Sequence, residues 1–261
     1  MKTISFSKYQ GTGNDFVIVD NRNGDFDGEN VKLINRLCDR KFGIGGDGLM
    51  LLESHSTLDF TMRYFNSDGH EASMCGNGGR CIAAFAVHQG VVKTPDRFAF
   101  MAVDGEHHAS YKDDIVTLKM IDVDKITITD THTFLDTGSP HHVKFIEDVK
   151  SVNVVDEGRS VRNSATYAPD GTNVNFVNFN DENEITVRTY ERGVEDETLA
   201  CGTGVVACAI SAHLQKPHFS DFNINVMGGK LRVFFSAEDK TFKNIWLEGP
   251  AKFVFSGTIN V

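Results

Sequence analysis

Two short segments of this 261-residue chain place a cysteine before the same glycine pattern. Cys75–Gly78 and Cys201–Gly204 both read Cys-Gly-x-Gly, and runs of small apolar residues follow, Arg80 to Gln89 and Val205 to Gln215. We therefore expect one thiol at each of two helix N-termini, where backbone N–H groups and the helix dipole lower a thiol pKa and attract an anion. Two such thiols facing one anionic substrate from opposite sides would form a two-base proton-transfer site.

A single Cys-Gly-x-Gly is a weak signal, because buried cysteines and glycine-rich turns are both common. The second copy, again followed by a small-residue apolar run, favours a functional pair. Two other interpretations stay open at this point: duplicated tight turns whose cysteines only pack, or a disulfide between the two. The remaining cysteines, Cys38, Cys81 and Cys208, lie within helical stretches, and we expect them to be small buried core residues.

Composition and charge exclude several classes of protein. Lys and Arg number 26 against 36 Asp and Glu, a formal net charge of −10, which argues against a sequence-independent nucleic-acid surface. No apolar run approaches the roughly 18 residues of a membrane-spanning helix. Five scattered cysteines without a Cys-x2-Cys pair fit neither a disulfide scaffold nor structural zinc. We expect a cytoplasmic protein that binds no nucleic acid, membrane or metal, although a local pocket for a small anion remains compatible.

Most of the chain reads as short strands with period-two alternation, of which Leu58–Phe65 is a clear case. The two runs that follow the cysteines lack a polar face, which marks buried helices. Further helices are expected at Glu29–Arg40 and Ile146–Asn153. A buried helix in strand-rich surroundings suggests a sheet wrapped around a central helix.

Because this pattern occurs twice, half a chain apart, we expect an α/β fold of the α+β type with two pseudo-symmetric domains. Residues 1–120 would form the half that carries Cys75, and residues 121–249 the half that carries Cys201. The last strand, at about 250–261, could cross back to complete the first half.

Polar residues at the ends of strands and loops suggest what is bound. Amides both donate and accept hydrogen bonds, so they suit the ammonium and carboxylate groups of an amino acid. Candidate amides are those of Asn14, Asn66, Asn77 and Asn173, each of which alone could equally be a turn residue. Glu191 and Arg192, about ten residues before Cys201, could add one charge of each sign or form a solvated surface pair. His141 follows Ser139 and Pro140 in a predicted loop.

Together these motifs closely resemble the diaminopimelate epimerase family, in order from the first strand to the last. They are Gly11–Phe16, Phe65–Gly69, Met74–Gly78, Gly138–His141, Thr172–Asn173, Tyr190–Gly193 and Ala200–Gly204. The resemblance implies a cofactor-independent epimerase that interconverts LL- and meso-diaminopimelate in lysine and peptidoglycan precursor biosynthesis. It also implies two similar domains with the site in the cleft between them, commonly in a homodimer.

The resemblance also assigns roles to residues. Cys75 and Cys201 would be the two bases, one thiolate and one thiol. The helix-start amides would hold the carboxylate at the reacting carbon, namely those of Gly76, Asn77, Gly202 and Thr203. Recognition of the substrate, particularly of its distal end, would fall to Asn14, Asn66, Asn173 and Arg192, while Glu191 and His141 would contact it and support the chemistry.

Two positions depart from the family pattern. Ser139 stands where many relatives carry Asn, which shortens any direct contact with substrate, and Gly48 stands where some carry Gln, so Gly48 offers no side-chain ligand. The nearest rival is a proline or hydroxyproline racemase, which typically carries His at the position of Asn77. A non-catalytic amino-acid-binding or thiol-redox protein is the alternative of a different class.

Overall fold

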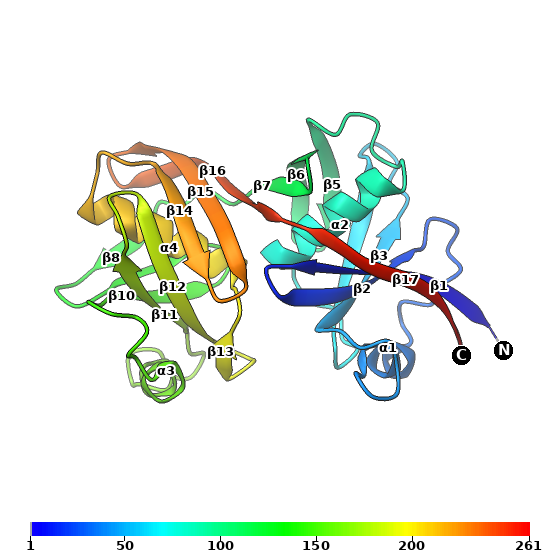
Figure 1. The fold of residues 1–261 in the computed structure, drawn as a ribbon, viewed down its shortest axis with the longest axis horizontal. Helices are drawn as coiled ribbons and strands as arrows, with labels where there is room; N and C mark the ends of the chain where they lie inside the picture. The colour runs from blue at the N-terminus through cyan, green and yellow to red at the C-terminus, as the bar shows by residue number, and fades with distance from the viewer. Residues whose placement is uncertain (1) are drawn as a thin grey trace. The chain divides into compact units, whose positions relative to one another are not determined.

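The computed structural model describes residues 2–261, which divide into two compact units. Unit 1 is the chain up to Leu118 together with Gly249–Val261, and unit 2 is Lys119–Glu248. In each unit the strands enclose one central helix (Figure 1). The C-terminal strand belongs to unit 1, where it pairs with the first strand of the chain.

Unit 1 holds two helices, α1 (Val31–Cys38) and α2 (Gly76–His88). Its strands are β1 (Thr3–Gly11), β2 (Asn14–Asp20), β3 (Gly48–Glu53), β4 (Phe60–Asn66), β5 (Phe98–Ala102), β6 (Gly105–Lys112), β7 (Ile115–Lys119) and β17 (Lys252–Asn260).

Unit 2 likewise holds two helices, α3 (Val154–Arg162) and α4 (Gly202–Gln215). Its strands are β8 (Ile126–Ile128), β9 (Thr133–Asp136), β10 (Pro140–Phe145), β11 (Asn173–Phe179), β12 (Glu184–Glu191), β13 (Asp196–Thr198), β14 (Asp221–Val226), β15 (Gly229–Glu238) and β16 (Thr241–Pro250).

The two units repeat one pattern of strand pairing. In unit 1, β17, β1 and β2 are antiparallel neighbours, β2 and β3 are parallel, β3 and β4 antiparallel, β4 and β5 parallel, and β5, β6 and β7 antiparallel. Unit 2 follows the same sequence of directions along β8, β9, β10, β11, β12, β14, β15 and β16. The predicted pseudo-symmetry is therefore confirmed at the level of strand order, and β17 takes in unit 1 the place that β8 takes in unit 2.

The central helices are buried because their sequences lack a polar face. Helix α2 contacts β1, β2, β3, β4, β6 and β17, and α4 contacts β9, β10, β11, β12, β14 and β15. Val205, Val206 and Ile210 of α4 are fully buried. The shorter helices cover outer cores: α1 packs with Ile34 and Leu37 in one cluster, and α3 lies over another. Among the described residues, none of the helices has the length and apolarity needed to cross a membrane.

The helix expected at Ile146–Asn153 is wrong, since these residues precede the helix that the structure contains. Helix α3 begins after Asn153, whose side chain accepts a hydrogen bond from the N–H of Asp156 (3.3 Å). An asparagine with this geometry is an N-cap, which starts a helix and cannot lie inside one. Helix α1 is also shorter than expected and begins after a second capping asparagine, Asn30.

Candidate active site

Both Cys-Gly-x-Gly segments form the start of a central helix, as the sequence predicts. Cys75 is the N-cap of α2 with φ −96° and ψ 133°, and Cys201 is the N-cap of α4 with φ −118° and ψ 113°. In each helix the carbonyl of the cysteine accepts the first intrahelical bond, from Gly79 N (2.7 Å) and Val205 N (3.0 Å). The backbone N–H groups of the residues between each cysteine and this first donor are not part of the intrahelical hydrogen bonding. Each unit thus presents a thiol beside a positive helix end.

Glycine is required in the second of these segments by close packing. A Cβ atom at Gly204 would lie 2.7 Å from Oδ1 of Asn175 and 3.3 Å from Sγ of Cys201. The absence of a side chain lets the buried amide of Asn175 approach the helix start. The Cys-Gly-x-Gly spacing here is therefore a packing requirement of the site as well as a turn signal.

In unit 1 the cysteine thiol lies near a pair of amides. Cys75 Sγ is 3.9 Å from Oδ1 of Asn14, and the same oxygen accepts a hydrogen bond from Asn77 Nδ2 (3.4 Å). Asn77 is 1% exposed, and its Oδ1 accepts from Nη2 of Arg80 (3.0 Å). The structure therefore brings together three residues that the sequence nominates, and adds a buried arginine behind them.

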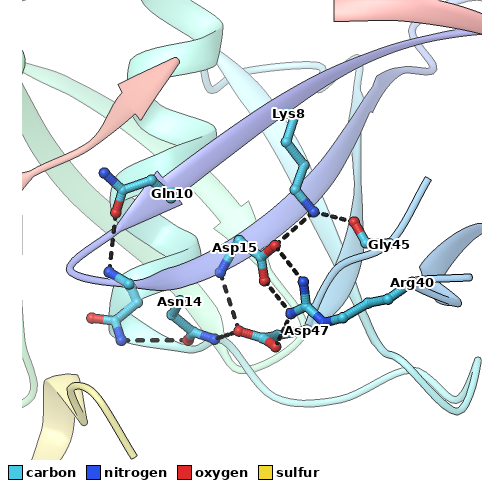
Figure 2. A network of polar contacts seen from close by, with 9 residues as sticks. Lys8, Gln10, Asn14, Asp15, Arg40, Gly45 and Asp47 are labelled. Atoms are coloured by element: carbon cyan, nitrogen blue, oxygen red, sulfur yellow. Dashed lines mark hydrogen bonds and ion pairs between the residues drawn. The ribbon is translucent and has the colours of Figure 1, made fainter. Parts of the chain in front are cut away.

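The orientation of Asn14 is set by a charged network (Figure 2). Asn14 Nδ2 donates to Oδ2 of Asp47, which leaves its Oδ1 directed to Asn77. Arg40 bridges Asp47 (2.7 Å) and Asp15 (2.6 Å), and Lys8 completes the network 2.8 Å from Asp15. Two cations thus offset two carboxylates. Burial opposes ionisation of Asp15, but hydrogen bonds from Arg40 and Lys8 outweigh it and lower the pKa of this carboxyl well below its usual range.

In unit 2 a buried histidine occupies the corresponding surroundings of Cys201. His141 is 0% exposed, and burial together with the charge of Arg192 lowers its pKa to about 3, so that the imidazole is neutral near pH 7. Asn175 Nδ2 donates to His141 Nδ1 (3.1 Å), and Thr189 Oγ1 donates to Asn175 Oδ1 (2.9 Å). Because Nδ1 accepts, Nε2 carries the proton of the neutral ring.

The N–H of His141 faces the start of helix α4. Its Nε2 lies 2.9 Å from Oγ1 of Thr203 and 3.0 Å from Oγ of Ser139, and these two hydroxyls are 3.1 Å apart. The Thr203 hydroxyl also lies 3.5 Å from Sγ of Cys201. A chain of neutral donors can therefore run from His141 through Thr203 to the sulfur. Thr137 supports it by donating to the carbonyl of Thr203 (2.8 Å).

Asn173 joins this cluster to the end of strand β12. Its Nδ2 donates to Ser139 Oγ (3.2 Å) and to Pro140 O (3.2 Å), and its Oδ1 accepts from the backbone N–H of Arg192 (2.9 Å). Both amide hydrogens are engaged within the protein, so one acceptor site of Oδ1 remains for a ligand. The guanidinium of Arg192 donates to Asp170 O (3.2 Å).

One of the residues predicted to bind substrate, Asn66, lies outside these clusters. Asn66 ends β4 with an exposed side chain that takes no part in the hydrogen bonds around Asn14, and it pairs in register with Gly48. A Cβ at Gly48 would lie 2.5 Å from Phe65 O, so this strand excludes a side chain there. Glu191 is half-buried at the end of β12.

The other three cysteines are core residues, as predicted. Cys38, Cys81 and Cys208 are each at most 3% exposed. Burial raises the pKa of Cys38 and of Cys81 to about 12, and raises that of Cys208 well above its ordinary value. These thiols are protonated at neutral pH, which leaves Cys75 and Cys201 as the candidates for ionisation. Within residues 2–261, no three His, Cys, Asp or Glu side chains are grouped to hold a metal ion.

The sequence matches the family model described as "Diaminopimelate epimerase" over residues 6–125 and 133–254. The diaminopimelate epimerase of Flavobacterium psychrophilum is 50% identical over 254 residues, which cover 97% of this chain and 98% of that relative. The enzyme of that name from Chlorobaculum tepidum is 41% identical over 260 residues, or 96% and 99% of the two chains. The chain belongs to the diaminopimelate epimerase family.

Solved structures of much lower sequence identity share the fold. A phenazine biosynthesis protein of the PhzF family from Bacillus anthracis aligns with a TM-score of 0.80 at 14% identity and covers 100% of both chains. A hydroxyproline epimerase from Agrobacterium vitis aligns with a TM-score of 0.69 at 14% identity, over 98% of this chain and 92% of that one. These likenesses show that the two-unit α/β fold extends beyond the diaminopimelate epimerase family.

Sequence reasoning missed several polar residues that contact and orient the predicted site residues. Asn175 and Arg80 are both wholly buried, and Asp47 fixes Asn14. A signal existed for Asn175, because it falls two residues after Asn173 and so shares its face of strand β11. Arg80 could have been noticed as a charge in an otherwise apolar helix. Asp47 carried no local signal.

Proposed function

We propose that this protein interconverts LL- and meso-diaminopimelate, with one cysteine removing the α-proton and the other returning a proton. The observation that carries the proposal is the pair of N-cap cysteines, Cys75 and Cys201, in a chain of the diaminopimelate epimerase family. Inversion of a carbon through a planar carbanion requires removal on one face and delivery on the other. Two fixed groups meet this requirement without either having to cross the carbon.

The proton balance follows from the two thiols. The thiolate of one cysteine takes the α-proton and becomes a thiol, while the thiol of the other gives its proton to the carbanion and becomes a thiolate. The substrate ends inverted, the total charge is unchanged, and the two cysteines have exchanged roles for the reverse direction. Because the pair shares one proton, its apparent pKa values belong to the dyad and not to either residue.

The helix starts would stabilise the carbanion. As the α-proton leaves, negative charge spreads onto the adjacent carboxylate, and backbone N–H groups directed at that charge lower the barrier. The helix-start residues Gly76, Asn77, Gly202 and Thr203 are suited to this task, since they open the helices whose positive ends the cysteines cap.

The remaining polar residues would recognise the diamino acid. Asn14 presents an acceptor oxygen, because its Nδ2 is engaged by Asp47, and an acceptor suits an ammonium group. The guanidinium of Arg192 suits a carboxylate. Asn66, Asn173 and Glu191 complete the proposed binding set. His141 would act as a neutral donor through Thr203 and not as a cation, since it is buried in the neutral form.

Solvent-deuterium exchange tests this function against its rivals. Purified protein is incubated in D2O with LL-diaminopimelate, and in parallel with L-proline and trans-4-hydroxy-L-proline, and the α-position is followed by proton NMR and mass spectrometry. We expect deuterium at the α-carbon of diaminopimelate together with the meso product. Labelling of proline or hydroxyproline instead would assign a racemase, and labelling of none of the three would indicate a binding or redox protein.

We further propose a cytoplasmic homodimer. A run of apolar side chains on β17 supports the dimer: Phe253 and Val254 are 51% exposed and Phe255 is 44% exposed. Contiguous exposed apolar residues of this kind mark protein interfaces. Light scattering on the eluted protein should give twice the chain mass of 28.9 kDa, and a monomer mass would exclude the dimer. A reducing compartment suits two catalytic thiols, and cell fractionation tests the location.

A further inference from the structure

A buried positive charge lies beside the first turn of helix α2. Arg80 is 0% exposed, and its side chain runs back towards the helix N-terminus. Nη1 donates to the carbonyl of Gly76 (3.4 Å), and Nη2 donates to Oδ1 of Asn77 (3.0 Å) and to Oγ1 of Thr12 (3.1 Å). Nε has no hydrogen-bond partner in the described chain. The guanidinium is thus held next to the two residues that follow Cys75.

All of these partners are neutral. Among residues 2–261, no carboxylate forms an ion pair with Arg80, whereas the mostly buried side chains of Arg63, Arg162 and Arg188 each have one. A buried charge without a counter-charge is costly, so an anion is expected nearby. The two thiols that interact electrostatically with Arg80 are those of Cys81 and Cys75. Burial raises the pKa of Cys81 to about 12, which excludes it as the anion and leaves Cys75.

The other charges around α2 balance one another. Lys8 and Arg40 are paired with Asp15 and Asp47, so this network adds no net charge at the helix start. At the far end of α2, His88 is hydrogen-bonded to the hydroxyls of Tyr9 (2.6 Å) and Tyr111 (2.8 Å), and Tyr111 donates to Asp114 (2.8 Å). Arg80 is therefore a cation without a carboxylate partner in the described chain, held on the two residues that follow Cys75.

The second central helix has no buried arginine at the matching position. Arg80 is the fifth residue after Cys75, and the fifth residue after Cys201 is Val206, which is fully buried and apolar. The groups around Cys201 are hydroxyls, amides and the neutral ring of His141. The cation that acts on this ring is Arg192, which is only half-buried and whose guanidinium donates to Asp170 O. Solvent screens a partly exposed charge, so Arg192 acts on its surroundings less strongly than the fully buried Arg80 does.

We propose that Arg80 is the counter-charge of a Cys75 thiolate, and that it makes Cys75 rather than Cys201 the cysteine that is ionised before substrate binds. One contact acts in the other direction: Asn14 Oδ1, 3.9 Å from Sγ, suits a protonated thiol. A thiol is a weak donor, whereas a full charge in buried surroundings acts strongly, so the arginine dominates. Arg80 is then a positioning residue, because it acts on the reaction through Cys75.

The wild-type protein provides the first test. The rate of alkylation by iodoacetamide is measured between pH 5 and 10, and peptide mass spectrometry reports Cys75 and Cys201 separately. The inflexion of each rate profile gives the ionisation of that thiol independently of its accessibility. We expect Cys75 to ionise at lower pH than Cys201 and below the ordinary thiol value of about 8.5. An inflexion for Cys75 at or above that of Cys201 would overturn the proposal.

Two substitutions separate charge from shape. Arg80→Gln removes the charge and Arg80→Lys keeps it, while both lose the guanidinium fork that joins Thr12 and Asn77. We expect Arg80→Gln to move the Cys75 inflexion up by at least about one pH unit, or about tenfold in rate below the inflexion, and Arg80→Lys to retain most of the low value. Arg22→Gln, which removes an exposed arginine paired with Asp20, is the matched control and should leave the profile unchanged.

Each outcome decides the matter. Equal shifts in the Gln and Lys variants would assign Arg80 to holding the turn at Thr12, and no shift in folded Arg80→Gln would exclude the counter-charge. If the Gln variant fails to fold, the wild-type comparison of the two cysteines still decides. The inference rests on the proposed function only for the catalytic use of the thiolate. Alkylation needs no substrate, so a result that overturns the counter-charge is distinguishable from a result of the deuterium-exchange test that overturns the proposed function.

Discussion

The surroundings of Cys75 and Cys201 reach similar backbone geometry with different chemistry. Both cysteines cap a buried helix that opens with Gly-x-Gly. Around Cys75 lie a fully buried arginine and a network of four charged side chains. Around Cys201 lie a neutral histidine, hydroxyls and amides, and the charge that acts on this histidine belongs to the half-buried Arg192. The repeated fold therefore fixes where each thiol stands, and the residues that differ between the repeats fix the charge near it.

This difference matters for a reaction in which two thiols share one proton. If both surroundings were alike, the resting enzyme would be divided between two protonation states, of which only one suits a given isomer. A charge on one side selects one state, and neutral donors on the other can still stabilise the sulfur after it gives up its proton. The predictions below test how far the two half-sites are equivalent.

The largest effect is expected from removal of either thiol. Cys75→Ala and Cys201→Ala should each lower the epimerisation rate by at least about a thousandfold, since each removes one of the two proton-transfer groups. Initial rates of meso-diaminopimelate formation measure the loss. Cys208→Ala, which removes a buried thiol of α4, is the matched control and should stay within a few-fold of wild type. Near-normal turnover in either catalytic variant would contradict the two-base mechanism.

The features shared by the half-sites were predictable from sequence because they are local. Each helix start follows from a glycine pattern and the apolar run behind it, and the repeated pattern predicted two equivalent halves. The error at Ile146–Asn153 has a local cause as well, because the capping role of Asn153 was overlooked.

Some residues that distinguish the half-sites, such as Arg80 and His141, stand out in the sequence, but their contacts were not predictable because these join distant residues. Arg80 reaches Thr12 across 68 positions, and Asp47 reaches Asn14 across 33. Nothing near Asp47 in the sequence indicates that its carboxylate would orient an amide of another strand. Such contacts are decided by how strands pack, which a single sequence does not specify residue by residue.

Removal of the carboxylate that fixes Asn14 should give the next largest effect. Asp47→Ala frees the Asn14 amide to rotate and leaves Arg40 with one carboxylate partner in place of two. A hydrogen bond to a charged group contributes about 1.5–3 kcal/mol, so we expect kcat/KM to fall by about ten- to a hundredfold, mainly through KM. Steady-state kinetics measure this split. Asp20→Ala, which removes an exposed carboxylate paired with Arg22, should change neither constant.

Acid should weaken the neutral half-site before the charged one. The pKa of His141 is about 3 in the folded protein, below its unfolded value of about 6.5, so its contribution to stability is present above pH 6.5 and is lost as the pH falls towards 3. Asp15, whose pKa is also lowered, loses its contribution only below its unfolded value of about 3.9. Urea unfolding should therefore show that the free energy of unfolding falls by on the order of 2 kcal/mol per neutral buried histidine between pH 7 and pH 5.

The histidine responsible can be identified by substitution. His142, whose pKa is lowered to about 4 by burial, acts in the same direction, so His141→Gln should remove part of the pH dependence and not all of it. The comparison is between the pH 7 to pH 5 differences of the two proteins, which cancels any loss of stability common to both pH values. An equal difference in wild type and His141→Gln would contradict a neutral buried His141.

The smallest effect is expected at the position that departs from the family pattern. Ser139 Oγ lies within 3.2 Å of His141, Thr203 and Asn173, so it belongs to the neutral donor network. In Ser139→Ala, Nε2 of His141 keeps Thr203 as an acceptor, while Nδ2 of Asn173 keeps the carbonyl of Pro140. One neutral hydrogen bond contributes about 1 kcal/mol, so kcat/KM should fall only about fivefold. A fall in kcat/KM as large as that of Asp47→Ala would mean that the Ser139 hydroxyl contacts substrate directly. It would also mean that neutral hydrogen bonds order the Cys201 half-site as strongly as ion pairs order the Cys75 half-site.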